Sequence, residues 1–334
     1  MRRPLNEATR ATGEALRAAG YTEAAVAHSL GLPGFTGSVL DGAWWTQASQ
    51  ATGTLQVLVD LFIHGARLPR RVVAAALPEA AWQARLVRDQ GGDVVSTGLC
   101  LPLGDDLIWT DRADEPSKLG GLFLPDSSTW ALRGCLPKRA VARHLDLGCG
   151  AGAVTVAAAR TAQQTWAGDI EGRASLATKR SALLSGVEGV NTWTGPAEDG
   201  PVHGQFDRVS FVLPLLRPLP HHDGAPRHTV ADDSGLLGRV IEAMPHMLAP
   251  GGIALLYTQA WPGGDRSLPE ALHDAFAHRP WRGAFWWDHP GDPDHGAPRA
   301  GVLAVRAESD HGWVARQRHA APSWDGLAAL LDEG

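Results

Sequence analysis

The segment 141–161 restricts the fold of this 334-residue chain more than any other. Its sequence, "VARHLDLGCGAGAVTVAAART", joins an apolar strand pattern to a glycine cluster and then to an alanine-rich helix pattern. Alternating strand and helix patterns continue after it, with strands predicted at 163–170, 189–195, 206–216, 253–261, 283–289 and 300–307 and helices at 173–185, 235–248 and 268–278. Such alternation predicts an α/β domain with a mostly parallel sheet that is covered on both faces.

The first 115 residues follow a different pattern. Two short helices are expected within 1–31 and a loop over 32–52, and further helical patterns lie at 54–65, 68–77 and 78–87. Strands within 93–104 and 106–111 then flank a turn at 104–106. Helices followed by a hairpin predict a winged-helix-like α+β domain over 1–115, which precedes the α/β domain at 116–334. Arg70 and Arg71 open the expected recognition helix, although we favour a structural or substrate-capping role for this domain.

Composition and charge exclude several classes of protein. The chain is 44% hydrophobic and 20% charged, which is typical of a soluble globular protein, and its net charge of −6 gives no general attraction for nucleic acid or anionic membranes. Its three cysteines, Cys100, Cys135 and Cys149, are odd in number and widely spaced, which fits a reducing cytoplasm. No signal peptide or membrane-spanning run is recognised.

The glycine cluster predicts a ligand site. Gly148, Gly150 and Gly152 lack a Cβ where the chain must turn and a ligand can approach closely, and the helix that follows offers free N–H groups. Ligands bind at the carboxyl ends of the strands in such sheets. Asp169 is expected at the end of the next strand, where an acid can accept hydrogen bonds from the hydroxyls of a ribose.

The spacing and charge of the cluster argue against common nucleotide loops. The glycines follow G-x-G-x-G rather than the G-x-G-x-x-G of dinucleotide sites, and the G-K-[ST] of a P-loop is absent. Asp146 stands two residues before the first glycine, where a negative charge repels a pyrophosphate but suits an ammonium or sulfonium group. The pattern therefore indicates a nucleoside that carries a cationic amino acid.

Four motifs in this order resemble the class I S-adenosylmethionine-dependent methyltransferases over residues 125–310: "HLDLGCGAGAVTVAAA", "AGDI", "FDRVSFVLP" and "LAPGGIALL". The resemblance implies a Rossmann-like fold with a seven-stranded, mostly parallel sheet, and S-adenosyl-L-methionine as the cofactor, with S-adenosyl-L-homocysteine as the product. The N-terminal region more loosely resembles actinobacterial relatives of the HemK-like and small-domain ribosomal RNA methyltransferases.

The resemblance also implies residue roles by position. The backbone of Gly148, Cys149 and Gly150 would contact the methionine part of the cofactor, and Asp146 its amino group. Asp169 would bind the ribose and Ile170 would pack on the adenine. Pro196 occupies the position of the usual adenine-reading acid, so that the backbone of Ala197 or the side chain of Glu198 would replace it.

The fourth strand indicates the kind of acceptor. N-methylating relatives end this strand with Asn-Pro-Pro-Tyr or Asn-Pro-Pro-Phe, which holds a planar amino group, whereas this chain has Val212, Leu213, Pro214 and Leu215. The resemblance implies that Val212 borders the cofactor in the place of the motif's Asn, whose amide is lost. Of the motif, only the proline at Pro214 is kept. The loss argues against adenine, guanine or glutamine as the acceptor.

Candidate acceptor-binding and catalytic residues lie around this strand end. Trp130, Tyr257 and Trp261 could supply aromatic faces for a flat apolar substrate. His221, His222 and His228 follow the strand and can titrate near neutral pH, so that one of them could act as a general base. The acids of this loop show no diagnostic metal-ligand spacing, and no metal is expected.

Three functions remain open. We favour a cytoplasmic methyltransferase of natural-product biosynthesis that methylates oxygen, carbon or ring nitrogen of a small apolar or aromatic molecule. The alternatives are a ribosomal RNA or protein N-methyltransferase, and a non-catalytic regulatory protein that binds the cofactor. We expect a small-molecule partner, no nucleic acid and no membrane, and make no prediction of the oligomeric state.

Overall fold

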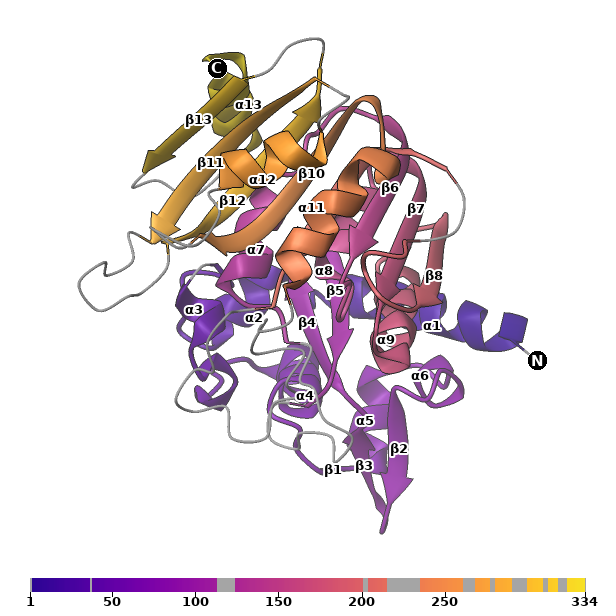
Figure 1. Cartoon of the computed structure of the whole chain (residues 1–334). Helices are drawn as coiled ribbons and strands as arrows, with labels where there is room; N and C mark the ends of the chain where they lie inside the picture. Colours follow the sequence, from indigo (N-terminus) through magenta and orange to yellow (C-terminus); the bar gives the residue numbers. More distant parts are fainter. Residues whose placement is uncertain are drawn as a thin grey trace.

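A central sheet organises the molecule, a computed structural model that describes residues 2–36, 38–112, 124–200, 204–214, 235–260, 268–276, 280–289, 299–308, 312–317 and 323–333. Among these residues, eight strands form this sheet in the upper part of Figure 1. In order across the sheet they are β13 (Gly312–Gln317), β11 (Trp281–His289), β12 (Arg299–Ala307), β10 (Leu248–Ala260), β9 (Phe206–Val212), β6 (Val141–Leu147), β7 (Ala162–Asp169) and β8 (Val190–Thr194).

The strand order has a switch point between β6 and β9. From β6 the chain proceeds to β7 and β8 on one side and then returns to β9 and β10 on the other, and all these neighbours are parallel. Strand β12 lies antiparallel between β10 and β11. The predicted α/β fold with a mostly parallel sheet is therefore confirmed, and its ligand site is expected where β6 and β9 end.

One edge of the sheet differs from the prediction. The last strand predicted from the sequence is 300–307, but β13 follows it and pairs in parallel with β11. The helix α13 (Trp324–Glu333) then packs against β11, with Leu327 and Leu330 buried. The edge strand and its covering helix thus extend the seven-stranded sheet that the resemblance implied.

Alternate residues of β10 show how both faces are covered. Leu256 packs with α11 (Leu236–Met247) and α12 (Leu268–Ala275), which lie in front of the sheet in Figure 1. Leu255 and Tyr257 pack instead with α7 (Ser127–Gly134) and α13. Helix α8 (Ala153–Ala159) contacts β6 and β7, and α9 (Gly172–Leu184) contacts β7 and β8. None of the described helices is both long and apolar enough to span a bilayer.

The N-terminal region lies below the sheet in Figure 1. Its elements are α1 (Arg2–Ala18), α2 (Glu23–Ser29), α3 (Ser38–Asp41), a 3-10 turn (Trp44–Thr46), α4 (Gly53–Phe62), β1 (Leu68–Pro69), α5 (Arg70–Ala76), α6 (Ala80–Gln83), β2 (Val87–Gln90), β3 (Asp93–Ser96), β4 (Leu99–Leu103) and β5 (Asp106–Thr110). From α4 to β3, the order of elements and the antiparallel β1-β3-β2 sheet are those of a winged helix.

Three local expectations in this region were wrong. The predicted loop 32–52 contains α3 and the 3-10 turn. The helix predicted over 78–87 ends at Gln83, because Arg85 adopts a φ of 57° and Val87 begins β2. The helix that precedes the hairpin of a winged helix is therefore α6, and not α5 with Arg70 and Arg71.

A fourth expectation was also wrong: the strand predicted within 93–104 divides into β3 and β4, so that the hairpin at the predicted turn, β4–β5, is a separate two-stranded sheet that packs against the α/β unit. The hydroxyls of Ser181 in α9 and of Ser185, which follows α9, accept hydrogen bonds from the Trp109 and Leu107 N–H groups of β5, at 2.8 and 2.9 Å. One hydrophobic cluster also joins N-terminal residues such as Leu58 to Val156 and Leu184. The proposed division at 115/116 falls outside the described residues.

Gly13 shows how closely the N-terminal helix approaches the α/β unit. Its position inside α1 conflicts with helix propensity, but a Cβ there would lie 2.0 Å from the carbonyl oxygen of Leu184, at the end of α9. Arg17 of the same helix donates to that carbonyl at 2.7 Å. The glycine therefore allows two backbones to meet.

We expect Gly13→Ala to lower the free energy of unfolding. The clash with backbone atoms should cost about 1–3 kcal/mol, which exceeds the gain in helix propensity of about 1 kcal/mol. The matched control is Gly238→Ala in α11, where an added Cβ meets nothing within 4 Å and stability should rise. Urea unfolding of both variants measures the difference, and equal shifts would contradict the assigned contact.

Candidate functional site

The glycine loop, residues 148–152, joins β6 to α8 at the switch point of the sheet. Gly148, Gly150 and Gly152 have φ values of 59°, 51° and 85°, which favour glycine. A Cβ on Gly148 would lie 2.5 Å from the ring of Phe211, and one on Gly152 would lie 2.8 Å from the Cα of Thr178. The backbone conformation therefore favours glycine at all three positions, and the packing also requires it at Gly148 and Gly152.

Helix α9 holds the loop from one side. The Thr178 hydroxyl donates to the carbonyl of Gly150 at 3.0 Å, and the Ser181 hydroxyl donates to the carbonyl of Ala151 at 2.7 Å. Because Ser181 also accepts the N–H of Trp109, the same residue connects the loop to β5. These contacts fix the loop before any ligand arrives.

Asp146 is a buried carboxylate at the base of the loop. Only 2% of it is exposed, and its two oxygens accept hydrogen bonds from the hydroxyls of Ser210, at 2.6 Å, and Thr155. Burial raises the pKa of Asp146 to about 6, although the two hydroxyls oppose this shift. Asp146 is therefore ionised at neutral pH at a cost in free energy, and a cationic ligand would recover that cost.

His144 lies two residues before Asp146 and is fully buried. It bonds to Arg208 and Ser210, so that both of its ring nitrogens have partners in the core. Burial, with the adjacent Arg208 charge, lowers the pKa of His144 well below its ordinary value. The imidazole is thus neutral.

Asp169 ends β7 next to the loop, in the place that the sequence predicted. Its carboxylate accepts the N–H of Gly150 at 3.0 Å and the N–H of Glu171 at 2.9 Å. The residue that follows, Ile170, is 59% exposed, which is unusual for a large apolar side chain. An acid and an exposed apolar residue therefore stand together at this edge of the loop.

Cys149 is a buried part of the loop. Its N–H donates to the carbonyl of Gly168 at 2.9 Å. Burial raises the pKa of its thiol well above the ordinary value, and the carboxylates of Asp169 and Asp146 add to this shift. The thiol therefore stays protonated at neutral pH, which fits a space-filling role rather than a nucleophile.

A cavity of about 120 Å³ opens above the loop. Asp146 and all loop residues except Gly152 line it, together with Val212 at the end of β9 and residues from the start of α7 and α8. The α7 and α8 side consists of Leu124, Pro125, Thr129, Ala153 and Val154. Apart from Asp146 and Thr129, the described side chains of this wall are apolar or small, and none is aromatic.

The predicted acceptor-binding residues are not all close to this cavity. Pro214 follows Val212 at the strand end and is partly buried. Tyr257 is buried against α7 and α13, and its carbonyl accepts the N–H of Leu213 at 3.0 Å. Trp130 packs against the N-terminal core cluster, although its neighbour Thr129 lines the cavity. Trp261, His221, His222 and His228 lie outside the described residues.

The expected adenine-reading segment follows β8. Ala197 packs against the cluster under α11, and Glu198 forms an ion pair with Arg239 of α11, at 2.8 Å. Both residues stay candidates for the adenine contact.

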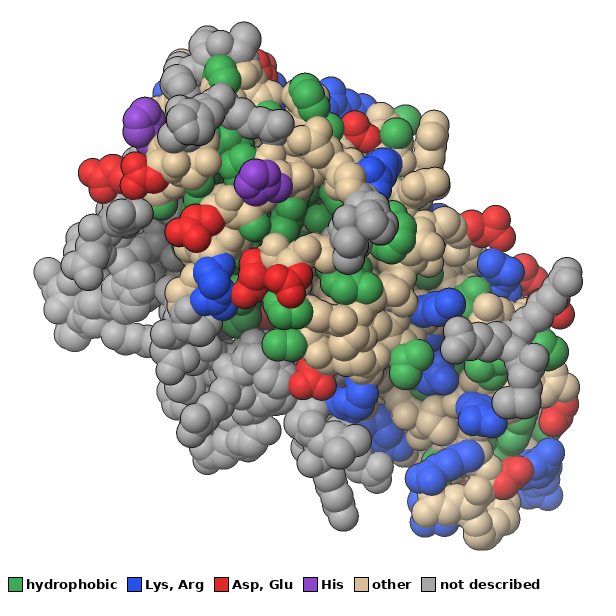
Figure 2. Space-filling view, turned by 45° about the vertical axis from the view of Figure 1, so that its right-hand side comes forward, with side chains coloured by type: hydrophobic (Ala, Val, Ile, Leu, Met, Phe, Trp, Pro, Cys, Tyr) green, Lys and Arg blue, Asp and Glu red, His purple; other side chains and the backbone are tan. Residues whose placement is uncertain are grey.

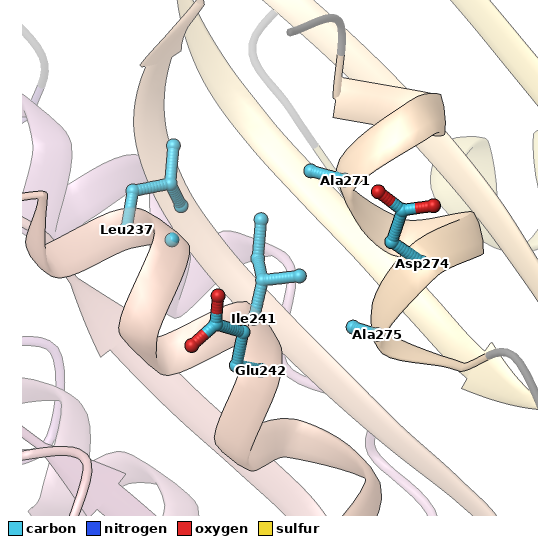
Figure 3. Close-up of a pocket in the computed structure, with 7 residues that line it drawn as sticks. Leu237, Ile241, Glu242, Ala271, Asp274 and Ala275 are labelled. Atoms are coloured by element: carbon cyan, nitrogen blue, oxygen red, sulfur yellow. The ribbon is translucent and has the colours of Figure 1, made fainter.

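A larger groove of about 340 Å³ lies between α11 and α12 (Figure 3). It is lined by Leu237, Ile241 and Glu242 of α11 and by Ala271, Asp274 and Ala275 of α12. No residue of the glycine loop reaches it. We therefore place the candidate active site at the smaller cavity.

Sequence reasoning missed the side chains that support the loop. Thr155, Thr178, Ser181 and Ser210 bond to Asp146 or to loop carbonyls. A signal was present in β9: in "FDRVSFV", Arg208 and Ser210 occupy alternate positions and share one face. Their register with His144 and Asp146 depends on the pairing of β6 with β9, which requires the fold.

Known proteins resemble parts of this chain. No family model matches it. A stretch of 136 residues is 32% identical to the ribosomal RNA small subunit methyltransferase C of Alcanivorax borkumensis and covers 40% of this chain and 36% of that protein. The chain thus spans about a third of the length of this curated relative.

Two solved structures are also similar. The ribosomal protein L11 methylase from Lactobacillus delbrueckii subsp. bulgaricus is 17% identical, with 55% of this chain and 78% of that chain covered and a TM-score of 0.38. The N-methyltransferase NodS from Bradyrhizobium japonicum, in complex with S-adenosyl-L-homocysteine, is 19% identical, with 55% and 87% covered and a TM-score of 0.37.

Proposed function

We propose that this chain is a class I S-adenosylmethionine-dependent methyltransferase, which transfers a methyl group from S-adenosyl-L-methionine and releases S-adenosyl-L-homocysteine. One observation carries the proposal: the cavity above the glycine loop has a buried carboxylate, Asp146, in a wall whose other described side chains, apart from Thr129, are apolar or small. Such a cavity repels phosphate and suits a cation. The proposal also rests on the curated 136-residue match.

The residues around the cavity fit this cofactor. Asp146 would hold its ammonium group, the backbone of Gly148, Cys149 and Gly150 would face its methionine part, and Asp169 would receive its ribose hydroxyls. Ile170 would cover the adenine, with Ala197 and Glu198 near its amino group. The bound cofactor would supply an electrophilic methyl group, so that the chain's main contribution is to position the acceptor.

We place the acceptor beside Val212 and Pro214. Among the residues that the structure describes, this wall offers no side-chain amide, which favours a small apolar or aromatic molecule that is methylated on oxygen, carbon or a ring nitrogen. Tyr257 and Trp261 would lie at the end of the next strand and Trp130 before the first, as further candidate contacts. A general base would come from His221, His222 or His228: all three alanine variants should keep cofactor binding, and one of them should lose turnover.

A second candidate acceptor is RNA. Arg85 is the one described residue other than glycine with positive φ, and it is exposed next to Arg180. The guanidinium of Arg180 lies 5.3 Å from the Trp109 ring centroid, and burial, together with the charge of Arg85, lowers its pKa. The backbone at Arg85 is strained, and the positively charged side chains of Arg85 and Arg180 lie close together, which suggests that they bind an anion. Lys and Arg side chains also gather at the lower right of Figure 2.

Titration calorimetry with S-adenosyl-L-methionine and S-adenosyl-L-homocysteine tests the proposed cofactor, with NAD as the negative control. We expect both sulfur compounds to bind and NAD to give no heat. Absence of binding by both would overturn the methyltransferase proposal. Binding without transfer of labelled methyl to small-molecule or RNA fractions would instead favour the regulatory alternative.

If RNA is the acceptor, Arg85→Glu should weaken its binding about tenfold and reduce the salt dependence by about one phosphate contact. The control is Arg316→Ala, a partly exposed arginine of β13 that pairs with Glu333. Filter binding of ribosomal RNA fragments at several salt concentrations measures both effects. Salt-insensitive wild-type binding, or equal losses in both variants, would remove RNA as a candidate.

A further inference from the structure

Four buried polar side chains form a continuous line across two adjacent strands. We call Arg208, His144, Ser210 and Asp146 the buried relay. His144 pairs in register with Arg208, and Asp146 pairs with Ser210, so that all four share one face of β6 and β9. The first three are fully buried and Asp146 is 2% exposed.

The hydrogen bonds of the buried relay have one direction. The guanidinium of Arg208 can only donate, so Nδ1 of His144, at 2.9 Å from its Nε, must accept. The neutral imidazole then carries its proton on Nε2 and donates it to Ser210 Oγ, at 3.1 Å. Ser210 in turn donates its own proton to Asp146 at 2.6 Å. Every donor in the line therefore points toward Asp146.

Arg208 anchors the far end. Its two remaining nitrogens donate to the carbonyls of Pro137 and Ala158, at 2.8 and 2.9 Å, and to the Thr161 hydroxyl at 3.0 Å. All three acceptors are neutral. Two backbone carbonyls and one hydroxyl therefore hold the positively charged guanidinium of Arg208 in place. A fixed cation at one end and a carboxylate at the other polarise the two neutral groups between them.

Simple core packing does not require these residues. The opposite face of the same strands is apolar, with Leu145, Leu147, Val209 and Phe211 in the core under α11. Four buried polar groups in place of such residues are costly unless fully bonded. The polar face ends at the cavity above the glycine loop, since Asp146 lines it.

We propose that Arg208, His144 and Ser210 are positioning residues, which hold Asp146 as an ionised, acceptor-only carboxylate for the ammonium group of the cofactor. This inference rests on the proposed function. It predicts that the relay sets the pH at which the cofactor is bound. No member besides Asp146 needs to touch the cofactor.

Each element packed against Asp146 places a titratable, charged or polar side chain near it. Cys149 in the loop has a raised thiol pKa and stays neutral, and Asp169 of β7 raises the pKa of Asp146 through its own charge. Helix α8 supplies the neutral Thr155 to Asp146. Arg133 of α7 bonds instead to the carbonyl of Ala153. The pH response near 6 is thus assigned to Asp146 itself.

The test is the pH profile of S-adenosyl-L-homocysteine binding to the full chain and to Ser210→Ala. Wild-type affinity should fall below about pH 6, where Asp146 takes up a proton. Loss of the Ser210 hydrogen bond should raise that midpoint by about one pH unit. The dissociation constant of Ser210→Ala should then be about fivefold higher than wild type at pH 6 and nearly equal at pH 8.5.

Ser185→Ala is the matched control, because Ser185 is also buried and hydrogen-bonded but bonds to Leu107 rather than to the relay. It should leave the midpoint unchanged. A midpoint that is the same in all three proteins, or that moves equally in both variants, would overturn the inference.

Nuclear magnetic resonance tests the relay without any cofactor. We expect His144 to keep its proton on Nε2 from pH 5 to pH 9, and the carboxyl signal of Asp146 to titrate at higher pH in Ser210→Ala than in wild type. A proton on Nδ1, or an unmoved Asp146 titration, would overturn the inference. Failure of the wild type to bind the cofactor at any pH would overturn the proposed function instead, while these signals still report on the relay.

Discussion

Asp146→Asn is expected to abolish most cofactor binding and yet to stabilise the free protein. Asparagine keeps the size of the side chain but removes the charge that would pair with the ammonium group. Removal of one partner from a buried charge pair typically costs about 3 kcal/mol or more, which corresponds to an affinity loss of at least about 100-fold. The remaining weak affinity should be flat between pH 5 and pH 8, because no group of the variant titrates at this position.

The gain in stability follows from the raised pKa. Burial moves the pKa of Asp146 to about 6 in the folded protein, and an unfolded aspartate has a pKa near 3.9. Between these values the folded state binds more protons than the unfolded state, so this group lowers stability as the pH rises through that window. At pH 7 a neutral asparagine in its place avoids this cost, and the variant should be more stable by about 3 kcal/mol.

Calorimetry and urea unfolding, at pH 5 and at pH 7, measure the two effects on the same preparations. At pH 5, which lies between the two pKa values, the difference in stability should fall to about half of its value at pH 7. Asp199→Asn is the control, because this exposed acid follows Glu198 away from the cavity and should change neither property. A destabilised variant, or one that binds the cofactor as tightly as wild type, would contradict the assignment of Asp146.

The glycine loop and its two acids could be predicted because they are local in the sequence. Gly148, Gly150 and Gly152 need a turn that only glycine makes easily, and Asp146 and Asp169 end consecutive parallel strands. Strand and helix periodicity likewise located the sheet from β6 to β12. These features depend on short segments whose chemistry is readable without long-range contacts.

The supporting contacts could not be predicted because they join distant segments. Ser210 reaches Asp146 only through the pairing of β9 with β6, and Gly13 is explained only by the end of α9. Strand β13 lacked a clear signal because "GWVARQ" has no strict alternation of apolar and polar residues. The helix predicted over 78–87 was longer than α6. Residues other than glycine rarely adopt a positive φ, so the sequence did not indicate the one at Arg85 that follows the helix.

The largest effect on stability is expected at Asp106, in the hairpin β4–β5. Its carboxylate is 3% exposed and accepts hydrogen bonds from Arg133 of α7, at 3.1 Å, and from Arg160 at the end of α8, at 2.6 and 2.8 Å. Arg133 also donates to the carbonyls of Leu103 and Ala153, and Ala153 lines the cavity above the glycine loop. One carboxylate thus connects the hairpin to two helices beside the candidate site.

Asp106→Ala should lower the free energy of unfolding by about 3–5 kcal/mol, because it leaves two arginines without their acid. Most of the cost should come from Arg133, whose side chain is 15% exposed, since Arg160 is 41% exposed and can turn to water. For a chain of this size the melting temperature should fall by roughly 5–10 °C. The double variant Asp106→Ala/Arg133→Met should therefore be less destabilised than the sum of its single changes.

Calorimetric melting of the four proteins in this cycle measures the coupling, with Asp105→Ala as the control. Asp105 is the exposed neighbour in the same turn and gives Arg160 only its backbone carbonyl, so its loss should change stability by about 0.5 kcal/mol or less. Equal effects of the two aspartates would contradict a buried connection.

Because the hairpin, α7 and α8 share this carboxylate, we expect the folded N-terminal and α/β regions to unfold in one transition, whereas Asp106→Ala should separate it into two.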